Sequence, residues 1–156
     1  MKIENFSWVI PGKLAGCSMP GSRENSIDDD IRLLSEQGVR VLVSLEHPGD
    51  GVAELCSQYG IEWIFFGISD FDIPADECSF SELVQTCSNA IITEKPVCVH
   101  CRAGIGRTGL VLSCIVGVYL KLSGEMALAA VRQSRSAVET VAQRSFISTF
   151  LADYEI

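Results

Sequence analysis

Residues 97–109 read VCVHCRAGIGRTG, and three motifs overlap within this stretch. Cys98 and Cys101 form a C-x-x-C pair, which is typical of redox and zinc sites. The three glycines form a G-x-G-x-x-G pattern, which is typical of dinucleotide-binding folds. Cys101 and Arg107 form a C-x5-R pattern, which is typical of enzymes that attack phosphate esters with a thiolate. The surrounding sequence has to decide between the three.

Length and composition limit the class of protein. The chain has 156 residues, of which 47% are hydrophobic and 21% are charged, as in an ordinary globular protein. We expect a single domain over residues 1–156, because this length suits one domain with a real core and is short for two. The net charge of −8 argues against nucleic-acid binding, since a phosphate backbone prefers a basic surface. A phosphorylated ligand would need a local positive field instead.

The sequence shows no targeting signal. Glu4 and Asn5 lie where a signal peptide would have a long apolar run. The longest apolar stretch, residues 110–120, is far shorter than the roughly 20 residues of a membrane span, so we expect a buried helix there. Seven cysteines without the spacing of a disulfide framework indicate free thiols in a reducing compartment. We therefore expect a cytoplasmic protein without a membrane span.

Predicted strands alternate with predicted helices, and only helices follow the last strand. This order predicts an α/β fold, a single-domain three-layer sandwich whose central, mainly parallel sheet of four to five strands is flanked by helices. The expected strands are 6–10, 13–17, 39–45, 61–68 and 96–100, and the expected helices are 27–37, 52–59, 80–95, 107–122, 124–135 and 140–154, with a carboxylate-rich loop at 69–79.

Two of the three motifs lack their required context. The dinucleotide pattern needs a second strand after its helix, and here more helix follows. Zinc needs about four ligands, but the chain has only two histidines and no second cysteine pair. Cys98 lies within a predicted strand, where a small buried side chain is the simpler interpretation. A redox pair with Cys101 has no thioredoxin-like context. We therefore expect no metal and no cofactor.

The C-x5-R pattern occurs twice, and its two copies differ in context. Cys17 and Arg23 enclose Pro20, and we expect an ordinary loop there, with no buried parallel strand before it and no helix directly after it. Around Cys101, a strand delivers the cysteine to the carboxyl edge of the sheet, where ligands bind in open α/β folds. A helix begins near Arg107. The second copy therefore has the context of a phosphate site.

The residues after Cys101 suit the binding of a phosphoryl group. Gly104 and Gly106 allow a tight turn whose N–H groups face inward as an anion nest. The positive end of the following helix points at the same place, and such fields favour a thiolate. The guanidinium of Arg107 matches two phosphate oxygens, and Thr108 can place its hydroxyl near the sulfur to ease its departure. The expected substrate-binding residues are Arg102, Ala103, Gly104, Ile105, Gly106 and Arg107.

HCRAGIGRTG, at 100–109, resembles the signature loop of the cysteine-based protein tyrosine phosphatase superfamily. FSWVIPGKLAG at 6–16, VSL at 43–45, SDF at 69–71 and VET at 138–140 resemble the small atypical dual-specificity phosphatases of the VHZ type, over nearly the whole chain. The resemblance implies the protein tyrosine phosphatase fold. It also implies hydrolysis of phosphotyrosine, with phosphoserine and phosphothreonine as a wider range, through a cysteinyl-phosphate intermediate. A phosphorylated protein or peptide would be the substrate.

The resemblance also suggests an acid and an orienting residue. The family carries its general acid on a loop before the nucleophile, and Asp70 lies 31 residues before Cys101. Asp72 and Asp76 share this loop, but SDF aligns Asp70 with the family's aspartate, so we prefer Asp70. His100 either orients the loop through a hydrogen bond or is an ordinary core histidine.

Four residues have two interpretations each. Arg135 either buttresses the phosphate loop or is a surface charge, and the Arg-Pro that is usual in the family is replaced here by Arg135-Ser136. Glu139 and Gln143 match positions near the pocket of related enzymes, where Gln143 would orient water, or they lie on a solvated helix face. Arg102 either adds positive potential to the loop or points to solvent.

Other functions remain open. The main alternative is a phosphatase for phosphoinositides, inositol phosphates or RNA 5′ phosphates. Such highly charged substrates usually require more basic loops, and Arg102 is the only other charged residue between Cys101 and Arg107, which favours phosphorylated proteins. A catalytically silent phosphate-binding module would usually have lost the acid or the nucleophile. A thiol redox protein would need a partner close to Cys101.

Overall fold

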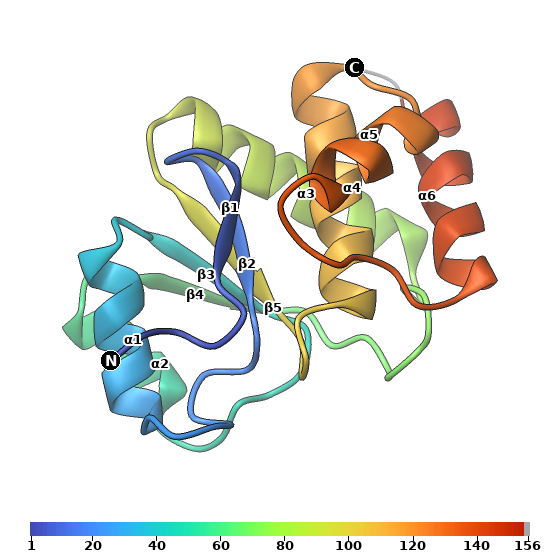
Figure 1. Ribbon diagram of the computed structural model, residues 1–156. Helices are drawn as coiled ribbons and strands as arrows, with labels where there is room; N and C mark the ends of the chain where they lie inside the picture. Colours follow the sequence, from blue (N-terminus) through green and yellow to red (C-terminus); the bar gives the residue numbers. More distant parts are fainter. Residues whose placement is uncertain (155–156) are drawn as a thin grey trace.

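The computed structural model describes residues 1–154, and its centre is a sheet of five strands (Figure 1). The strands are β1 (Ser7–Ile10), β2 (Leu14–Cys17), β3 (Val41–Ser44), β4 (Glu62–Phe65) and β5 (Val97–His100). Their order is β1-β2-β5-β3-β4, with β1 antiparallel to β2 and every other pair parallel. The predicted mainly parallel sheet is confirmed.

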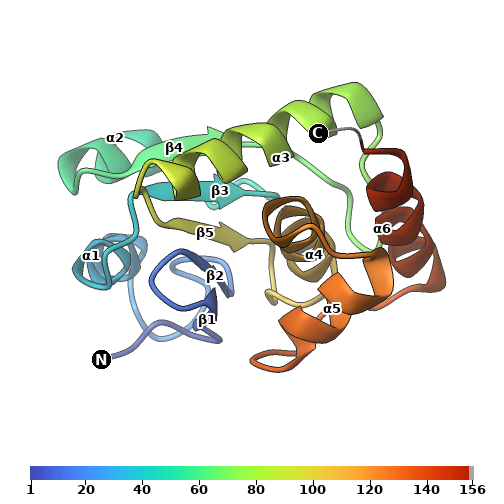
Figure 2. The same ribbon diagram turned by 90° about the horizontal axis from the view of Figure 1, so that it is seen from above.

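Within residues 1–154, six helices flank this sheet, so the predicted α/β sandwich is also confirmed. Helices α1 (Ile27–Glu36) and α2 (Val52–Gln58) lie on one face, and α3 (Glu77–Ile92) and α4 (Gly106–Leu120) lie on the other (Figure 2). Helices α5 (Gly124–Arg132) and α6 (Val141–Asp153) pack against α4 on the side away from the sheet.

Strand β5 contributes to both hydrophobic cores, because successive side chains of a strand point to opposite faces. Val97 and Val99 pack in the core under α3 and α4, whereas Cys98 packs in the core under α1 and α2. Cys101, just past the strand, belongs to the first of these cores. The C-x-x-C cysteines therefore lie on opposite sides of the sheet, which excludes a direct pair.

Helix α4 is the buried helix that the apolar stretch predicts. Every residue from Gly106 to Gly117 is buried, and the helix is enclosed by the sheet and by α3, α5 and α6. No single described helix is long and apolar enough to cross a membrane, and α4 and α5 satisfy that length and composition only jointly, with a bend of 115° between them.

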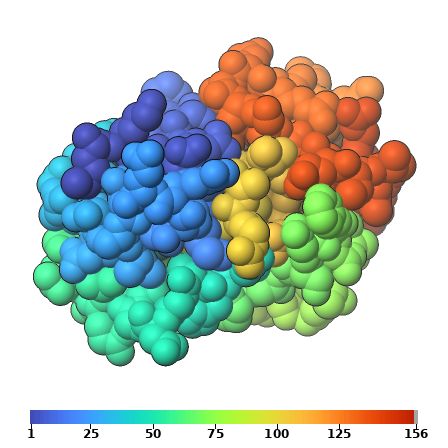
Figure 3. All heavy atoms as spheres, turned by 60° about the horizontal axis from the view of Figure 1, so that its bottom comes forward, coloured from blue at the N-terminus to red at the C-terminus, as the bar shows by residue number. Residues whose placement is uncertain are grey.

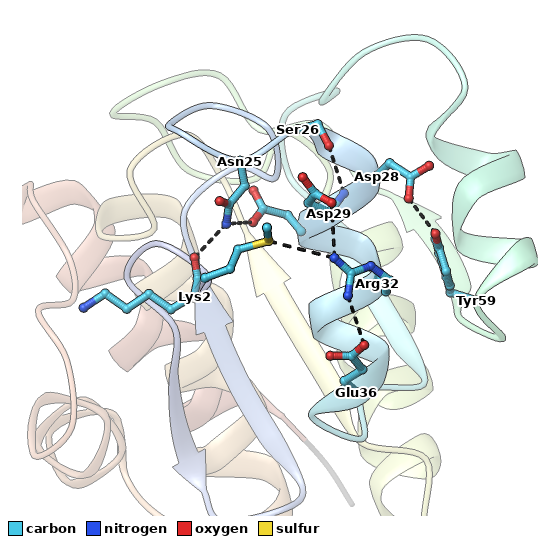
Figure 4. A network of polar contacts seen from close by, with 10 residues as sticks. Lys2, Asn25, Ser26, Asp28, Asp29, Arg32, Glu36 and Tyr59 are labelled. Carbon is cyan, nitrogen blue, oxygen red and sulfur yellow. Dashed lines mark hydrogen bonds and ion pairs between the residues drawn. The ribbon is translucent and has the colours of Figure 1, made fainter.

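Helix α1 begins as predicted, at a serine cap followed by carboxylates (Figure 4). Ser26 Oγ accepts a hydrogen bond from the N–H of Asp29 at 3.0 Å. Arg32 lies between Asp29 and Glu36, at 3.2 Å from each carboxylate. These exposed ion pairs add little stability by themselves, so the cap is the main local determinant of this helix start.

The predicted loop at 69–79 is too long at its carboxyl end. Helix α3 starts at Glu77, because Asp76 caps it by accepting the N–H of Cys78 at 3.1 Å. The same helix ends at Ile92, before the predicted 95, since Glu94 has a left-handed φ of 63°. The loop that carries Asp70 and Asp72 is therefore shorter than the sequence indicates.

The interpretation of Cys17 needs a correction. The sequence predicts no buried parallel strand before it, but β2 is fully buried and pairs in parallel with β5. The hairpin with β1 conceals this partner, because a turn between two short apolar runs predicts only an antiparallel pair. What separates Cys17 from Cys101 is the following chain, since no helix starts at Arg23 and α1 begins only at Ile27.

Gly109 offers a test of how tightly α4 is packed. A Cβ at this position would lie 2.6 Å from Ala137 Cβ and 2.7 Å from the Val138 backbone nitrogen. We expect Gly109→Ala to lower the free energy of unfolding by about 1–3 kcal/mol in urea titrations. The atoms next to the added methyl group are a Cβ and backbone atoms of residues 137 and 138, which cannot move aside by a side-chain rotation.

Ser113 on the same helix provides the matched control. Its hydroxyl is buried and has no hydrogen-bond partner within residues 1–154. Ser113→Ala should therefore leave the free energy of unfolding unchanged or raise it, because it removes an unsatisfied polar group. If both variants lost the same free energy of unfolding, the loss in Gly109→Ala would reflect a general sensitivity of α4 to substitution. It would then not report the close contact at Gly109.

Candidate active site

The loop at residues 101–106, between β5 and α4, is held by its carbonyl groups. Three consecutive carbonyl oxygens accept hydrogen bonds from outside the loop. Because the C=O and N–H of a peptide unit point in opposite directions, the following N–H groups turn into the loop. No N–H group of residues 102–106 donates a hydrogen bond within the described chain. The loop is thus a ring of free donors, as an anion nest requires. The bonds are Met19 N–H to Arg102 O (2.9 Å), Ser18 Oγ and Asn5 Nδ2 to Ala103 O (2.9 and 3.0 Å) and Arg135 Nη2 to Gly104 O (2.7 Å).

Glycine is required at position 104. Its φ is +79°, in the left-handed region that side chains disfavour. A Cβ there would also lie 2.5 Å from the carbonyl oxygen of Cys17, at the end of β2. The loop therefore turns tightly against the neighbouring strand, as expected for a backbone that approaches other backbone closely.

Arg135 ties this loop to the hairpin of β1 and β2. Its Nη2 donates to Gly104 O, while its Nη1 donates to Gly16 O at 2.7 Å and to Ser7 Oγ at 2.8 Å. The side chain is only 7% exposed, so the surface-charge interpretation is wrong. Burial lowers the pKa of this guanidinium, and the three acceptors compensate for part of its loss of water, since the buried Nε has no partner among the described residues.

A chain of hydrogen bonds holds the backbone of the candidate nucleophile. His100 Nδ1 lies 2.8 Å from the carbonyl oxygen of Cys101, which can only accept, so Nδ1 carries the proton. Its Nε2 then accepts from Ser44 Oγ at 2.6 Å, and Ser44 Oγ accepts from Trp63 Nε1 at 2.8 Å. The network fixes the neutral tautomer of His100. Through Nδ1 this histidine makes a direct hydrogen bond to the first residue of the loop.

Cys101 and Arg107 are both 3% exposed and lie at the two ends of the loop. Arg107 Nη1 donates to Ile68 O at 2.9 Å. Its Nη2 contacts two carboxylates, Glu46 Oε1 at 3.0 Å and Asp70 Oδ1 at 3.2 Å. Helix α4 begins at Gly106, so its positive end adds to the field of the guanidinium.

The three candidate acids differ in what they touch. Asp70 contacts Arg107, and its side chain is 51% exposed. Asp72 Oδ1 accepts the N–H of Ile73 at 2.8 Å and has no ion pair among the described residues. Asp76 caps α3, and hydrogen bonds from the Ser79 hydroxyl and nearby N–H groups lower the pKa of its carboxyl. Of these three, Asp70 alone lies beside Arg107.

Gln143 is fully buried, so it does not lie on a solvated helix face. Its Oε1 accepts the N–H of Glu139 at 2.9 Å and that of Thr140 at 3.3 Å, which forms a capping box at the start of α6. Its Nε2 donates to Asp72 O at 3.2 Å, so α6 is fastened to the loop of the candidate acids. Glu139 itself is exposed, and its carboxylate lies against Gly106.

Among the described residues, the side chains of Thr108 and Arg102 make no hydrogen bond to the sulfur of Cys101. Thr108 is buried, and its hydroxyl has no hydrogen-bond partner in the described part of the chain. The side chain of Arg102 is 67% exposed and pairs with Glu46. The Arg102 guanidinium therefore lies on the exposed side of the site, on the same carboxylate as Arg107.

In Figure 3 the yellow segment near residue 100 reaches the surface between the blue N-terminal segment, the green segment near residue 75 and the red segment near residue 140. Sequence reasoning missed several residues that complete this site. Glu46 had a detectable signal, because it follows the buried strand β3 at the same carboxyl edge as Cys101. Ser18 and Trp63 had none, since each acts through one long-range hydrogen bond.

Cys98 and Cys17, one from each of the two rejected cysteine patterns, lie together in the core. Cys98 Sγ lies 3.6 Å from Cys17 Sγ, and both thiols are buried under α1 and α2. The contact with Cys98 and burial raise the pKa of the Cys17 thiol well above its usual value. These two cysteines are therefore core residues on the face of the sheet opposite to Cys101.

Comparisons with known proteins agree with this geometry. The family model described as "Polymorphic toxin system, DSP-PTPase phosphatase" matches residues 15–119. Mouse "Protein tyrosine phosphatase domain-containing protein 1" is 25% identical over 92% of this chain and 21% of its own length. Human "Dual specificity protein phosphatase CDC14C" is 25% identical over 94% of this chain and 34% of its own length. The chain thus spans about a fifth to a third of these relatives.

Solved structures share the fold at low sequence identity. Kinase associated phosphatase, with its catalytic site cysteine replaced by serine, has a TM-score of 0.83 at 21% identity and covers 99% of both chains. PTPMT1 in complex with PI(5)P has a TM-score of 0.79 at 16% identity over 96% of both chains. The PP-IP phosphatase SIW14 of S. cerevisiae has a TM-score of 0.74 at 21% identity, over 98% of this chain and 89% of its own.

His100 provides a pH-dependent test of the network. Burial lowers the pKa of His100 from 6.5 to about 4. Above pH 6.5 the histidine is neutral in both the folded and the unfolded protein. Between pH 6.5 and 4 the unfolded protein binds a proton at His100 that the folded protein does not, so stability is lost as the pH falls through this range. We expect a loss of about 3 kcal/mol in the free energy of unfolding over this window.

The measurement compares urea unfolding of the wild type and of His100→Gln between pH 7 and pH 4. The variant should be less stable at pH 7, because it breaks the network, but its stability should depend less on pH. The difference between the two proteins should therefore shrink by about 3 kcal/mol on acidification. A difference that stays constant would mean that His100 is not held neutral in the folded protein.

Proposed function

The chain belongs to the DSP-PTPase phosphatase family within the cysteine-based protein tyrosine phosphatases, and we propose that it is a protein phosphatase. Its substrates would be phosphotyrosine monoesters, with phosphoserine and phosphothreonine as a wider range. One observation carries this proposal: the carbonyls of residues 102–104 are bound from outside, which leaves the N–H groups free between Cys101 and Arg107.

In the proposed first step, the thiolate of Cys101 attacks phosphorus. A sulfur–phosphorus bond forms, and the bond from phosphorus to the leaving oxygen breaks. The ring of N–H groups and Arg107 would stabilise the negative charge of the transferring phosphoryl group. Asp70 would give its proton to the leaving oxygen; its position 3.2 Å from Arg107 supports this choice, because it places the carboxyl beside the group that would hold the phosphoryl oxygens.

In the second step, water replaces the thiolate. The carboxylate of Asp70 would take a proton from water as its oxygen attacks phosphorus, and the sulfur–phosphorus bond breaks. We propose that the Thr108 hydroxyl donates a hydrogen bond to the departing sulfur, because this buried hydroxyl has no other partner among the described residues. Gln143 would position the acid loop rather than water, since both ends of its amide already bind backbone groups.

The charge of the site favours a phosphorylated protein over a more highly charged substrate. Arg102 is the only charged residue between Cys101 and Arg107, and the chain has a net charge of −8. Two fold neighbours carry printed descriptions of the alternative, PTPMT1 with PI(5)P and the PP-IP phosphatase SIW14. Phosphoinositides, inositol phosphates and RNA 5′ phosphates therefore stay the second candidate class, supported by likeness of fold alone.

We also propose a cytoplasmic location. All seven cysteines are free thiols in the structure. This cysteine usage is typical of a reducing compartment, and a thiolate nucleophile requires one to stay active.

The first test replaces the nucleophile. Cys101→Ser should abolish hydrolysis of p-nitrophenyl phosphate and of a phosphotyrosine peptide, because a serine hydroxyl here has no base to ionise it. Cys98→Ser is the matched control, since it changes a buried cysteine of β5, the strand before Cys101, that faces the opposite core. Phosphatase activity that survives in Cys101→Ser would refute the assignment.

A second test concerns the acid. Asp70→Asn should lower kcat on a phosphotyrosine peptide by about a hundredfold to ten-thousandfold, the usual contribution of a general acid. The decline of kcat at rising pH, which reports loss of the acid's proton, should also disappear. Asp72→Asn should keep both the rate and the pH profile. If Asp72→Asn shows the loss instead, the acid is two residues further along the chain.

A further inference from the structure

Glu46 joins the two arginines of the site, and neither the family match nor the sequence motifs assign it a role. It lies two residues after β3, with a side chain that is 24% exposed. One carboxylate oxygen is 3.0 Å from Arg107 Nη2, and the other contacts Arg102 Nη2. One carboxylate therefore bridges a buried guanidinium and an exposed one.

The bridge occupies Arg102, the exposed cation that directly follows Cys101 among the described residues. Arg107 is 3% exposed and reserved for the reacting phosphoryl group, while the side chain of Arg102 is 67% exposed. With Asp70 and Glu139 included, the mouth of the site holds two guanidinium groups and three carboxylates, so no net positive side-chain charge remains there. The remaining positive field comes from backbone N–H groups, which surround one phosphoryl group only.

We propose that Glu46 determines the substrate class by excluding ligands that carry a second phosphate beside the reacting one. A phosphorylated tyrosine presents one phosphate, and nothing on it faces Glu46. A neighbouring phosphate would meet the Glu46 carboxylate and would find Arg102 already paired. Like charges brought together at a binding site are a common means of rejecting the wrong ligand. This inference rests on the proposed phosphatase activity and specifies its substrate.

A purely structural role for Glu46 makes a different prediction. If Glu46 only positioned Arg107, its loss would slow hydrolysis of every phosphate ester by the same factor. If Glu46 selects substrates, its loss changes the ratio between a substrate with one phosphate and a substrate with neighbouring phosphates. The ratio of the two kcat/KM values is therefore the quantity to measure.

The experiment compares p-nitrophenyl phosphate with inositol 1,4,5-trisphosphate, whose 4- and 5-phosphates are neighbours. We expect Glu46→Gln to raise the trisphosphate to monophosphate ratio of kcat/KM by about tenfold, because one charge repulsion is removed and Arg102 is released. The constant for competitive inhibition of p-nitrophenyl phosphate hydrolysis by the trisphosphate should fall by a similar factor, which tests binding without turnover.

Three control variants isolate the cause. Arg102→Gln alone should leave the ratio unchanged, because Arg102 is occupied in the wild type, whereas Glu46→Gln combined with Arg102→Gln should lose most of the gain. Glu62→Gln removes a carboxylate that pairs with Lys95 at 3.8 Å on the exposed edge strand, and it should have no effect. Glu46→Ala serves as a second uncharged variant if the glutamine variant does not fold.

The outcomes separate this inference from the proposed function. An unchanged ratio in both Glu46 variants, or an equal loss on both substrates, would overturn the inference while leaving the phosphatase intact. A wild type that already prefers the trisphosphate would overturn it too. A wild type inactive on every phosphate ester would instead contradict the proposed function itself.

Discussion

The site depends on one constraint of the peptide backbone, which is that a loop can offer its N–H groups to an anion only if its carbonyl groups bind elsewhere. Carbonyls packed against other segments need partners, and here they find them in three separate parts of the chain. Met19 and Ser18 follow β2, Arg135 follows α5, and Asn5 precedes β1. The parallel pairing of β2 with β5 brings the first two beside the loop. Much of the fold thus serves to orient three peptide units.

The local backbone field at the loop differs in sign from the net charge of the protein. The chain is acidic, yet the end of β5 collects N–H groups, a helix N-terminus and Arg107. The carboxylates of Glu46 and Asp70 then lie on that same guanidinium. A dianionic phosphoryl group would have to replace those contacts with its own oxygens, and only the field of the N–H groups is unopposed.

The sequence predicts the fold and the centre of the site, because both follow from local signals. Strand and helix order came from periodicity and caps, and Cys101 with Arg107 came from a motif within a strand–loop–helix context. The strand β2 was misjudged, since nothing local reveals that a hairpin strand has a parallel partner 80 or so residues away. Arg135 had two interpretations for the same reason, because its burial arises from distant contacts with Ser7 and Gly16.

The guanidinium that crosses from the end of α5 to the hairpin also bears on where this enzyme could be divided. The family model matches residues 15–119, a segment that contains Cys101, Arg107 and Asp70 but neither Ser7 nor Arg135. A fragment cut at those limits would keep these three residues and lose the hydrogen bonds through which Arg135 joins the Gly104 peptide to the hairpin. The geometry of the proposed site therefore depends on a longer span of the chain than the family match covers.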